Sequence, residues 1–451
     1  MTGSARPFPR FLSLALLCAG LFGLGGCRTP STPSVPVGPA QPARPLGSAV
    51  SPPQASALPV MLGIDVLEER GFSAVAGKRI GLLTHPAGVN RRGESTVDVL
   101  ARAPGVRLVA LFAPEHGIRG DLKAGAQVSD TTDPKTRLPV YAFYGDNLAR
   151  AKERLVGLDA LVIDLQDIGV RSYTFNVAMR YALEACFERG VEVIILDRPN
   201  PLGGLKVDGP LLDREWFSGV GAFRIPYVHG LTMAELALFA VQEPGALPNI
   251  SEAARNRGRL TIVPMRGWRR EMRWTETGLT FVPTSPNVRD FPAVIGYAMI
   301  GLGCESSGFT HGIGAEYPFR GLSFKGVTAE KLAADLTALR VPGVAFRPVA
   351  LSEGRNQKTG VYVELTDWAA WNPTELSFAL MRLACTYDRA NPFAKLTTDE
   401  ARHFNIHVGS TAWWTALKRD GARVNLEAFL ADWKTQTVAY QQQVKKYWLY
   451  Q

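Results

Sequence analysis

The chain has 451 residues, of which 46% are hydrophobic, and a formal net charge of +9 at pH 7. This length and apolar content exclude an intrinsically disordered protein and predict two folded domains. The basic residues form no run and no nucleic-acid-binding motif, so nucleic acid is not an expected partner. An anionic cell-wall polymer or a phospholipid surface fits the positive charge better.

The first 26 residues predict a lipoprotein signal peptide. Two arginines precede an apolar stretch at residues 11–24, which is too short to span a bilayer as a helix. The motif LGGC at residues 24–27 resembles a lipobox, in which the cysteine is lipidated and the chain is cleaved before it. We therefore expect a membrane anchor on Cys27. The alternative is a plain secretory signal with a chance cysteine.

Residues 27–58 predict a tether between this anchor and a folded part that begins near Pro59. After Cys27 they contain eight prolines and no acidic residue, which is typical of an extended linker. Arg28 is not the aspartate that retains such lipoproteins at an inner membrane. We therefore expect an exported, lipid-anchored protein at an outer membrane, facing the periplasm.

Strand-like and helix-like segments alternate from residue 60 to about residue 265. The predicted strands are 79–84, 107–112, 139–143, 160–165, 191–196 and 260–265, and the predicted helices are 95–103, 147–155, 175–189 and 232–242. This alternation predicts an α/β fold, with a Rossmann-like doubly wound domain at residues 59–288. Four of the strands run directly into polar residues. In a parallel sheet these carboxyl ends form the ligand crevice.

The remaining residues, 289–451, predict a smaller α+β domain. Loops rich in glycine, proline and tryptophan precede helical segments at residues 328–339, 373–388, 410–419 and 425–447. Apolar residues recur at helical spacing in the last segment, so we expect it to pack on its own domain. Cys186, Cys304 and Cys385 are widely spaced and odd in number, which predicts core positions rather than disulfide bonds or a metal site.

The segment RLVALFAPEHGIRG, at residues 107–120, supplies the first candidate for catalysis. Its apolar strand stops at Glu115, His116 and Arg119, and two glycines let the backbone approach a ligand. A partly desolvated Glu115 could protonate a leaving group near neutral pH, so it is the expected catalytic acid, with His116 and Arg119 beside it as binding residues. The alternative is a carboxylate that pairs with Arg119 and holds the loop.

A second cluster, DLQDIGVRSY, combines carboxylates, an amide, a guanidinium and an aromatic ring, a mixture that suits a sugar. Asp164 and Asp167 are candidates for catalysis. Gln166, Arg171 and Tyr173 are candidates for substrate binding, the last by stacking on a pyranose. Alternation along a strand would point Asp164 and Gln166 one way and Asp167 the other. One of the two aspartates is therefore expected to be structural.

A third cluster, DRPNPLGG, begins at Asp197. Asp197, Arg198 and Asn200 are candidates for substrate binding, as is His229 in a later loop. Arg198 would either clamp an anion or neutralise Asp197, and the sequence leaves both roles open.

The sequence predicts no cofactor and no metal. It contains no HExxH, no GxSxG, no P-loop and no GxGxxG after the first predicted strand. His85, His116, His229 and several aspartates could converge, but no two histidines are expected at helix-face or hairpin ligand spacing.

Eight ordered motifs between Gly63 and Asn287 closely resemble the NamZ-like exo-β-N-acetylmuramidases. They are GIDVL, GKRIGLLTHPAGV, APEHGIRG, LPVYAFYG, DLQDIGVRSYTF, LDRPNPLGG, HGLTMAELA and SPN. The resemblance implies a peptidoglycan-recycling glycosidase that releases N-acetylmuramic acid from the non-reducing ends of muropeptide or glycan fragments. It also implies an active cleft between the two domains and Glu115 as the key catalytic residue. Arg171 or Arg198 would then clamp the lactyl carboxylate of muramic acid.

One stretch departs from the family pattern. Where the family carries a sequence like EGTNxSEGRGTxxPF, this chain has ESSGFTHGIGAEYPF, beginning at Glu305. Gly308, His311 and Ile313 replace an asparagine, a glutamate and an arginine. If this stretch contacts the substrate, we expect a changed sugar or fragment preference, and the retained Glu305 is a further candidate for substrate binding.

Together these features predict a lipid-anchored exo-glycosidase with Glu115 as proton donor. The partner carboxylate is open among Asp164, Asp167 and Glu305, because glycosidases generally use two carboxyl groups. Two rivals are a non-catalytic sugar-binding lipoprotein, which would not need Glu115, and a metal-dependent hydrolase, which a chelator would inactivate. The oligomeric state is unknown from the sequence.

Overall fold

The computed structural model describes residues 60–313, 316–353 and 356–451, which belong to one compact unit, Pro59–Gln451. The predicted signal peptide, the lipidation site at Cys27 and the tether lie outside the described residues. Within the described part, no helix is both long enough and apolar enough to cross a membrane.

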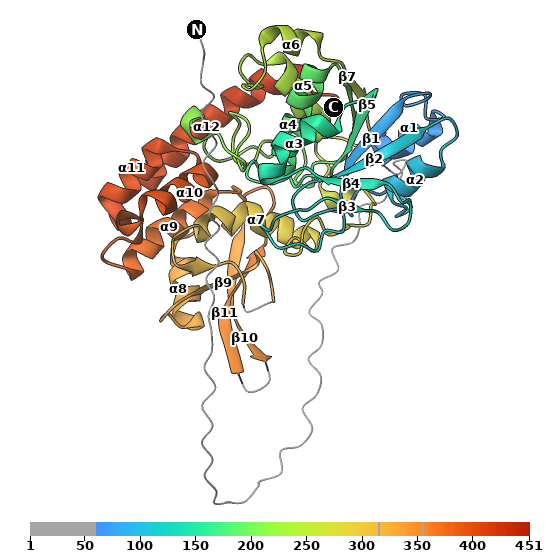
Figure 1. Cartoon of the computed structure of the whole chain (residues 1–451). Coiled ribbons are helices and arrows are strands. Elements are labelled where there is room, and N and C mark those ends of the chain that lie inside the picture. The colour runs from blue at the N-terminus through green and yellow to red at the C-terminus, as the bar shows by residue number, and fades with distance from the viewer. Residues whose placement is uncertain (1–59, 314–315, 354–355) are drawn as a thin grey trace, which may run out of the picture. The chain divides into compact units, whose positions relative to one another are not determined.

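A seven-stranded sheet organises the first part of this unit (Figure 1). In spatial order its strands are β3 (Thr131–Thr132), β4 (Pro139–Ala142), β2 (Arg107–Ala113), β1 (Arg79–Thr84), β5 (Ala160–Asp164), β6 (Glu192–Leu196) and β7 (Leu260–Val263). All pair in parallel except the short edge strand β3. Without β3 this is the Rossmann order, so the topological switch point, where ligands bind, lies between β1 and β5.

Helices cover both faces of this sheet. The helices of this part are α1 (Gly63–Glu69), α2 (Thr96–Arg102), α3 (Leu148–Arg154), α4 (Thr174–Arg189), α5 (Met233–Gln242) and α6 (Glu252–Arg257). In β5, Leu161 and Ile163 pack in the core that includes α4 and α5, while Val162 packs in the core that includes α1 and α2. Every residue of β5 and β6 is buried, as expected of parallel strands with helices on both sides.

The second part begins with α7 (Phe291–Cys304) and contains an antiparallel sheet of four strands. Their spatial order is β10 (Val344–Glu353), β11 (Asn356–Leu365), β9 (Gly321–Phe324) and β8 (Phe309–Thr310). The remaining helices are α8 (Ala329–Ala338), α9 (Glu375–Tyr387), α10 (Thr398–Val408), α11 (Thr411–Asp420) and α12 (Leu426–Val444). The predicted α/β fold with a smaller α+β part is confirmed, although α1, α6, α7 and α10 were not predicted.

The last helix only partly packs as expected. Trp433 of α12 lies against a phenylalanine of α9, with 4.3 Å between ring centroids. Further along α12, however, the Tyr440 hydroxyl donates a hydrogen bond to the backbone carbonyl of His229 at 3.2 Å, in the Rossmann-like part. The Tyr450 hydroxyl then donates to Asp197 at 2.5 Å. The last helix and the chain end therefore join the two parts instead of serving one of them.

Candidate active site

Glu115 lies in the loop after β2, and its hydrogen-bond partners among the described residues are uncharged. One carboxylate oxygen accepts the N–H of Gly125 at 2.8 Å and the hydroxyl of Tyr144 at 3.0 Å. The other accepts the hydroxyl of Thr174, the first residue of α4, at 2.6 Å. Glu115 is only 7% exposed. These contacts orient the carboxyl group from both of its oxygens.

The alternative in which Glu115 pairs with Arg119 is wrong, because Arg119 is exposed and forms no ion pair with a described residue. His116 holds the loop instead. Its backbone has a φ of 70°, its Nδ1–H donates to the carbonyl of Leu122 at 2.8 Å, and the N–H of Leu122 donates back to the carbonyl of His116 at 3.3 Å. His116 therefore shapes the loop that carries Glu115, and only its Nε2 is left for a ligand.

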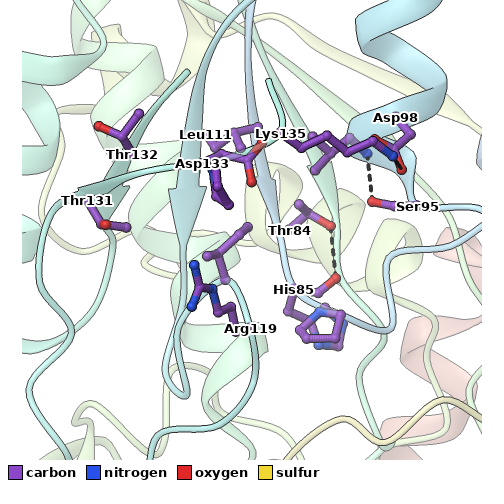
Figure 2. Close-up of a pocket in the computed structure, with 14 residues that line it drawn as sticks. Thr84, His85, Ser95, Asp98, Leu111, Arg119, Thr131, Thr132, Asp133 and Lys135 are labelled. Carbon is purple, nitrogen blue, oxygen red and sulfur yellow. Dashed lines mark hydrogen bonds and ion pairs between the residues drawn. The ribbon is translucent and has the colours of Figure 1, made fainter. Parts of the chain in front are cut away.

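A pocket of about 200 Å³ adjoins this loop at the carboxyl ends of β1 and β2 (Figure 2). Arg119 and His85 border it, as do Lys135 and Asp98, which pair at 2.6 Å. Glu115 is not among the lining residues. The pocket therefore does not contain the candidate proton donor, but it leaves the Arg119 guanidinium accessible to an anionic group.

Asp164 and Arg198 form a buried ion pair at the switch point. Two nitrogens of Arg198 bind the two carboxylate oxygens of Asp164 at 2.5 and 2.8 Å, and Thr96 donates a further hydrogen bond to Asp164. The side chains of the pair are 0% and 3% exposed. This geometry corrects two expectations. Asp164 is the structural aspartate of its cluster, and Arg198 neutralises Asp164 rather than Asp197 or a substrate anion.

Arg171 likewise has a structural role, because it binds backbone carbonyls inside the fold. It is fully buried, and its terminal nitrogens donate to the carbonyls of Pro210, Ile225, His407 and Val408 at 2.7, 3.0, 3.1 and 2.9 Å. Burial lowers the pKa of Arg171 to about 10, which still leaves it charged at neutral pH. Because two of these carbonyls end α10, Arg171 ties the second part to the first. The expectation that it clamps a substrate carboxylate is corrected accordingly.

A polar network follows the ends of β1 and β5. The N–H of Gln166 donates to Nε2 of His85 at 3.0 Å, so the proton of the neutral ring lies on Nδ1. Burial lowers the pKa of His85 well below its ordinary value and keeps the ring neutral. Asp167 accepts the N–H of Gly169 at 2.8 Å, and the same carboxylate oxygen lies 3.7 Å from Nε2 of His229.

Four buried atoms of this network have no hydrogen-bond partner among the described residues. They are Nδ1 of His85, Oε1 of Gln166, Oδ1 of Asp167 and Nε2 of His229. Buried polar atoms are nearly always hydrogen-bonded in folded proteins, so several unpaired atoms in one network indicate a place where water or a polar ligand completes the bonding. Donors and acceptors are both present, which suits the hydroxyl and amide groups of an amino sugar.

Tyr297 of α7 relates this network to Glu115. Burial raises the pKa of the Tyr297 phenol, and the negative charges of Glu305, Glu115 and Asp167 raise it further. The Tyr297 hydroxyl lies 3.4 Å from that of Ser172. Tyr297 is thus a buried group on which the charges of Glu305, Glu115 and Asp167 all act.

The side chains of Tyr173 and Asn200 are buried and form hydrogen bonds within the fold. The Tyr173 ring is buried, and its hydroxyl donates to Thr284 at 2.9 Å, so the ring offers no open face to a pyranose. The Asn200 side chain closes a turn, accepting the N–H of Leu202 and donating to the carbonyl of Leu231, both at 3.0 Å. Both positions correct the expectation of direct substrate binding.

Asp197 caps the start of α5. Its carboxylate accepts the N–H of Ala234 at 3.0 Å and the hydroxyls of Thr232 and Tyr450 at 2.8 and 2.5 Å. Burial raises the pKa of Asp197 to about 7, and the nearby charge of Glu235 adds to the effect. Asp197 is fully buried, so it too is structural and not a ligand of the substrate.

The comparisons with known proteins identify the family of the chain. A family model described as exo-β-N-acetylmuramidase NamZ, N-terminal, matches residues 80–292, and its C-terminal counterpart matches residues 295–450. The chain belongs to this family. It is 39% identical over 313 residues to the peptidoglycan β-N-acetylmuramidase NamZ of Bacillus subtilis strain 168. That alignment covers 68% of this chain and 73% of the relative.

Solved structures carry the same fold. The chain is similar to a DUF1343 family protein from Bacteroides fragilis NCTC 9343, with 35% identity and a TM-score of 0.76. A second DUF1343 family protein from the same organism has 26% identity and a TM-score of 0.66. Each alignment covers 87% of this chain and 99% of the solved chain. The predicted resemblance to the NamZ family is therefore confirmed over both parts.

Glu305 begins the stretch that departs from the NamZ family pattern, and it lies just after α7. Its Oε2 is 3.4 Å from Nε2 of His403. Burial raises the pKa of the Glu305 carboxyl, but His407, His403 and His311 outweigh this effect and lower it. Ligand atoms of Glu305, His403 and His407 lie within 4.8 Å of one another. The expectation that no two histidines stand at ligand spacing was therefore wrong, whereas the absence of a catalytic metal stays a prediction.

Several residues of the NamZ site were missed from the sequence. Tyr144 and Thr174 hold Glu115, and each lies inside a family motif quoted above, so the motifs could have indicated them. Tyr297 lies on an apolar helix with no polar pattern, so nothing in the sequence pointed to it. His403 and His407 stand four residues apart, a helix-face spacing that was visible in the sequence.

Proposed function

We propose that this chain is an exo-acting β-N-acetylmuramidase that releases N-acetylmuramic acid from the non-reducing ends of peptidoglycan fragments. Membership of the NamZ family and the named activity of the B. subtilis relative support this activity. The observation that carries it in the structure is Glu115, a nearly buried carboxyl group with uncharged partners beside the switch point of the sheet.

Glu115 acts in this proposal as the general acid. Its proton passes to the glycosidic oxygen as the bond from that oxygen to the anomeric carbon breaks. The oxygen of a water molecule then bonds to the anomeric carbon, and the proton that this water loses returns to the Glu115 carboxylate. Tyr144 and Thr174 fix the carboxyl group from two sides, so the proton is presented in one direction. Such positioning lowers the barrier because little reorganisation is needed during the reaction.

Asp167 is the partner carboxylate in this proposal. Its Oδ1 has no hydrogen-bond partner among the described residues, whereas both oxygens of Asp164 are bound by Arg198. A negative charge at this place stabilises the positive charge that develops on the anomeric carbon. The Nε2 of His229, 3.7 Å from Asp167, would keep that carboxylate oriented while substrate is bound.

Arg119 is the proposed contact for the lactyl carboxylate of muramic acid. Of the three arginines expected at this edge, Arg171 and Arg198 are buried in the fold, and Arg119 alone lies open on a pocket. A planar guanidinium binds a carboxylate with two parallel hydrogen bonds.

The deciding experiment measures free N-acetylmuramic acid released from a disaccharide with muramic acid at its non-reducing end. We expect release by the wild type and a loss of about a hundredfold or more in kcat for Glu115→Gln. Glu188→Gln is the matched control, because it also replaces a glutamate by glutamine. Glu188 lies on the surface near the end of α4, where it pairs with Lys152. Disaccharide binding without release by the wild type would instead identify a sugar-binding lipoprotein.

We also propose that the chain is exported and anchored through lipidated Cys27, which would place the enzyme at an outer membrane facing the periplasm. Support for this rests on the LGGC motif and the proline-rich composition of residues 28–58. Muropeptides are present in that compartment, so the location agrees with the proposed substrate.

A further inference from the structure

Two histidines and a glutamate meet on the surface of the second part of the fold. His403 and His407 lie on the same side of α10, one helical turn apart, and their rings are 4.6 Å apart between centroids. Glu305 reaches them from the end of α7, a segment almost a hundred residues earlier in the chain. The glycosidase proposal uses none of these three side chains, although the charge of Glu305 acts on Tyr297 as those of Glu115 and Asp167 do.

The spacing of these groups suits a transition metal. Zinc binds imidazole nitrogen and carboxylate oxygen at about 2.0–2.2 Å, so two ligands of a tetrahedral site lie about 3.3 Å apart. The Nε2 of His403 and the Oε2 of Glu305 are already 3.4 Å apart. All three ligand atoms lie within 4.8 Å of one another, so His407 stands close enough to be the third ligand.

The ring of His407 is oriented for such a role. Its Nδ1 lies 2.9 Å from the backbone carbonyl of His403, and because a carbonyl can only accept, Nδ1 carries the proton. The lone pair of Nε2 is then free for a metal. Metal-binding histidines usually donate their second N–H to a carbonyl or carboxylate in this way, which fixes the ring and its tautomer.

The elements that carry the cluster are fixed independently of any metal. Helix α10 starts with a capping box between Thr397 and Glu400, and Gly409 ends it in the left-handed region with a φ of 78°. Arg171 holds the carbonyls of His407 and Val408 from the Rossmann-like part. These contacts hold the backbone of α10 in place without a metal, so the helix that carries both histidines does not depend on ion binding to form.

We propose that Glu305, His403 and His407 form a binding site for a divalent transition metal ion, with zinc as the best match. Two imidazoles and one carboxylate are the ligand set of many zinc and non-haem iron sites, and calcium or magnesium would require more oxygen ligands. Three protein ligands leave at least one coordination position for water or an anion. His403 is 59% exposed, so an ion can enter from solvent.

The proposed site includes Glu305, the first residue of the stretch that departs from the family pattern. His311, which stands where the family carries a glutamate, stacks on Phe319 at 4.2 Å, and Phe319 lies 4.7 Å from the Tyr297 ring. Phe319, the last residue of the stretch that begins at Glu305, thus contacts the tyrosine on which the charge of Glu115 acts. A metal here would stiffen the stretch of the chain that differs from its relatives.

The test is zinc binding by the full chain, purified without a polyhistidine tag. Equilibrium dialysis gives the bound zinc per chain, and the visible absorption of the cobalt-substituted protein reports the coordination geometry. We expect one zinc per chain, and an affinity at least about a hundredfold lower in His403→Ala and in His407→Ala, because loss of a ligand exceeds the effect of losing its supporting contacts.

Two controls separate the site from general effects. Arg402→Ala changes the exposed neighbour of His403 on the same helix and should bind zinc like the wild type. Exchange of the two residues, Arg402→His with His403→Arg, keeps the composition but breaks the four-residue spacing, and it should lose the site. Circular dichroism verifies that each variant is folded. Equal zinc binding by the wild type and the folded His403→Ala variant would overturn the proposal, as would a wild type that binds no zinc.

Discussion

The stability of this protein should fall as the pH rises from about 4 to 7, and Asp197 should be a main cause. In the unfolded chain this aspartate releases its proton near its ordinary pKa of 3.8, whereas burial raises the folded-state pKa to about 7. Between these values the folded state holds the proton and the unfolded state does not. Protonation therefore favours the fold in this window, and the stability it contributes is lost as pH rises through 7.

The magnitude follows from the two pKa values. A rise from 3.8 to about 7 corresponds to about 4 kcal/mol of unfolding free energy, at about 1.4 kcal/mol for each pH unit. The measurement is urea denaturation of wild type and Asp197→Asn at a series of pH values. Between pH 4 and pH 8 the wild type should lose about this amount of unfolding free energy relative to Asp197→Asn, because asparagine cannot ionise.

Asp133→Asn is the control for this experiment. Burial opposes ionisation of Asp133, but hydrogen bonds from Thr136 outweigh it and lower the pKa of Asp133 below its ordinary value. The stability that ionised Asp133 contributes is therefore present above its ordinary pKa and lost only at lower pH. The difference in unfolding free energy between wild type and Asp133→Asn should therefore stay constant from pH 4 to 8. A flat curve for Asp197→Asn as well would refute the reasoning.

Three further predictions concern the fold, the site and the anchor. Arg171→Met should lower the unfolding free energy by about 3 kcal/mol or more, measured by urea denaturation, because it leaves four buried carbonyls without their charged donor. Tyr144→Phe should lower kcat about tenfold with little change in KM, since it removes one of the groups that position Glu115; an unchanged kcat would contradict that role. Cys27→Ala should abolish labelling by a fatty-acid probe and move the protein from the membrane fraction to the soluble fraction, and persistence in the membrane fraction would contradict anchoring at Cys27.

The sheet was predictable because its pattern is local. Each parallel strand is a short apolar run that ends in polar residues, so β1, β2, β5 and β6 and their ligand edge could be found without knowing the strand order. Glu115 became a candidate for the same reason. Helix α7 was missed because it is apolar on all sides, with mainly glycine and alanine between its large residues, and shows no helical periodicity.

The partners of the charged residues could not be predicted in the same way. Arg198 follows Asp197 in the sequence, yet it binds Asp164, because β5 and β6 are neighbours and bring those two side chains together. Arg171 reaches carbonyls more than two hundred residues further along the chain. Which arginine stays free for a substrate therefore depends on tertiary packing. The local sequence around Arg171 and Arg198 resembles a binding motif although both side chains are buried in the fold.

The attachment of the chain end to Asp197 has a consequence for biosynthesis. Tyr450 is synthesised 253 residues after Asp197, so until then the Rossmann-like part lacks the hydroxyl that donates to this carboxyl group. We expect that part to reach its final stability only after Tyr450 has been made. A nonsense product or a proteolytic fragment that lacks Tyr450 would then be a substrate for quality-control proteases.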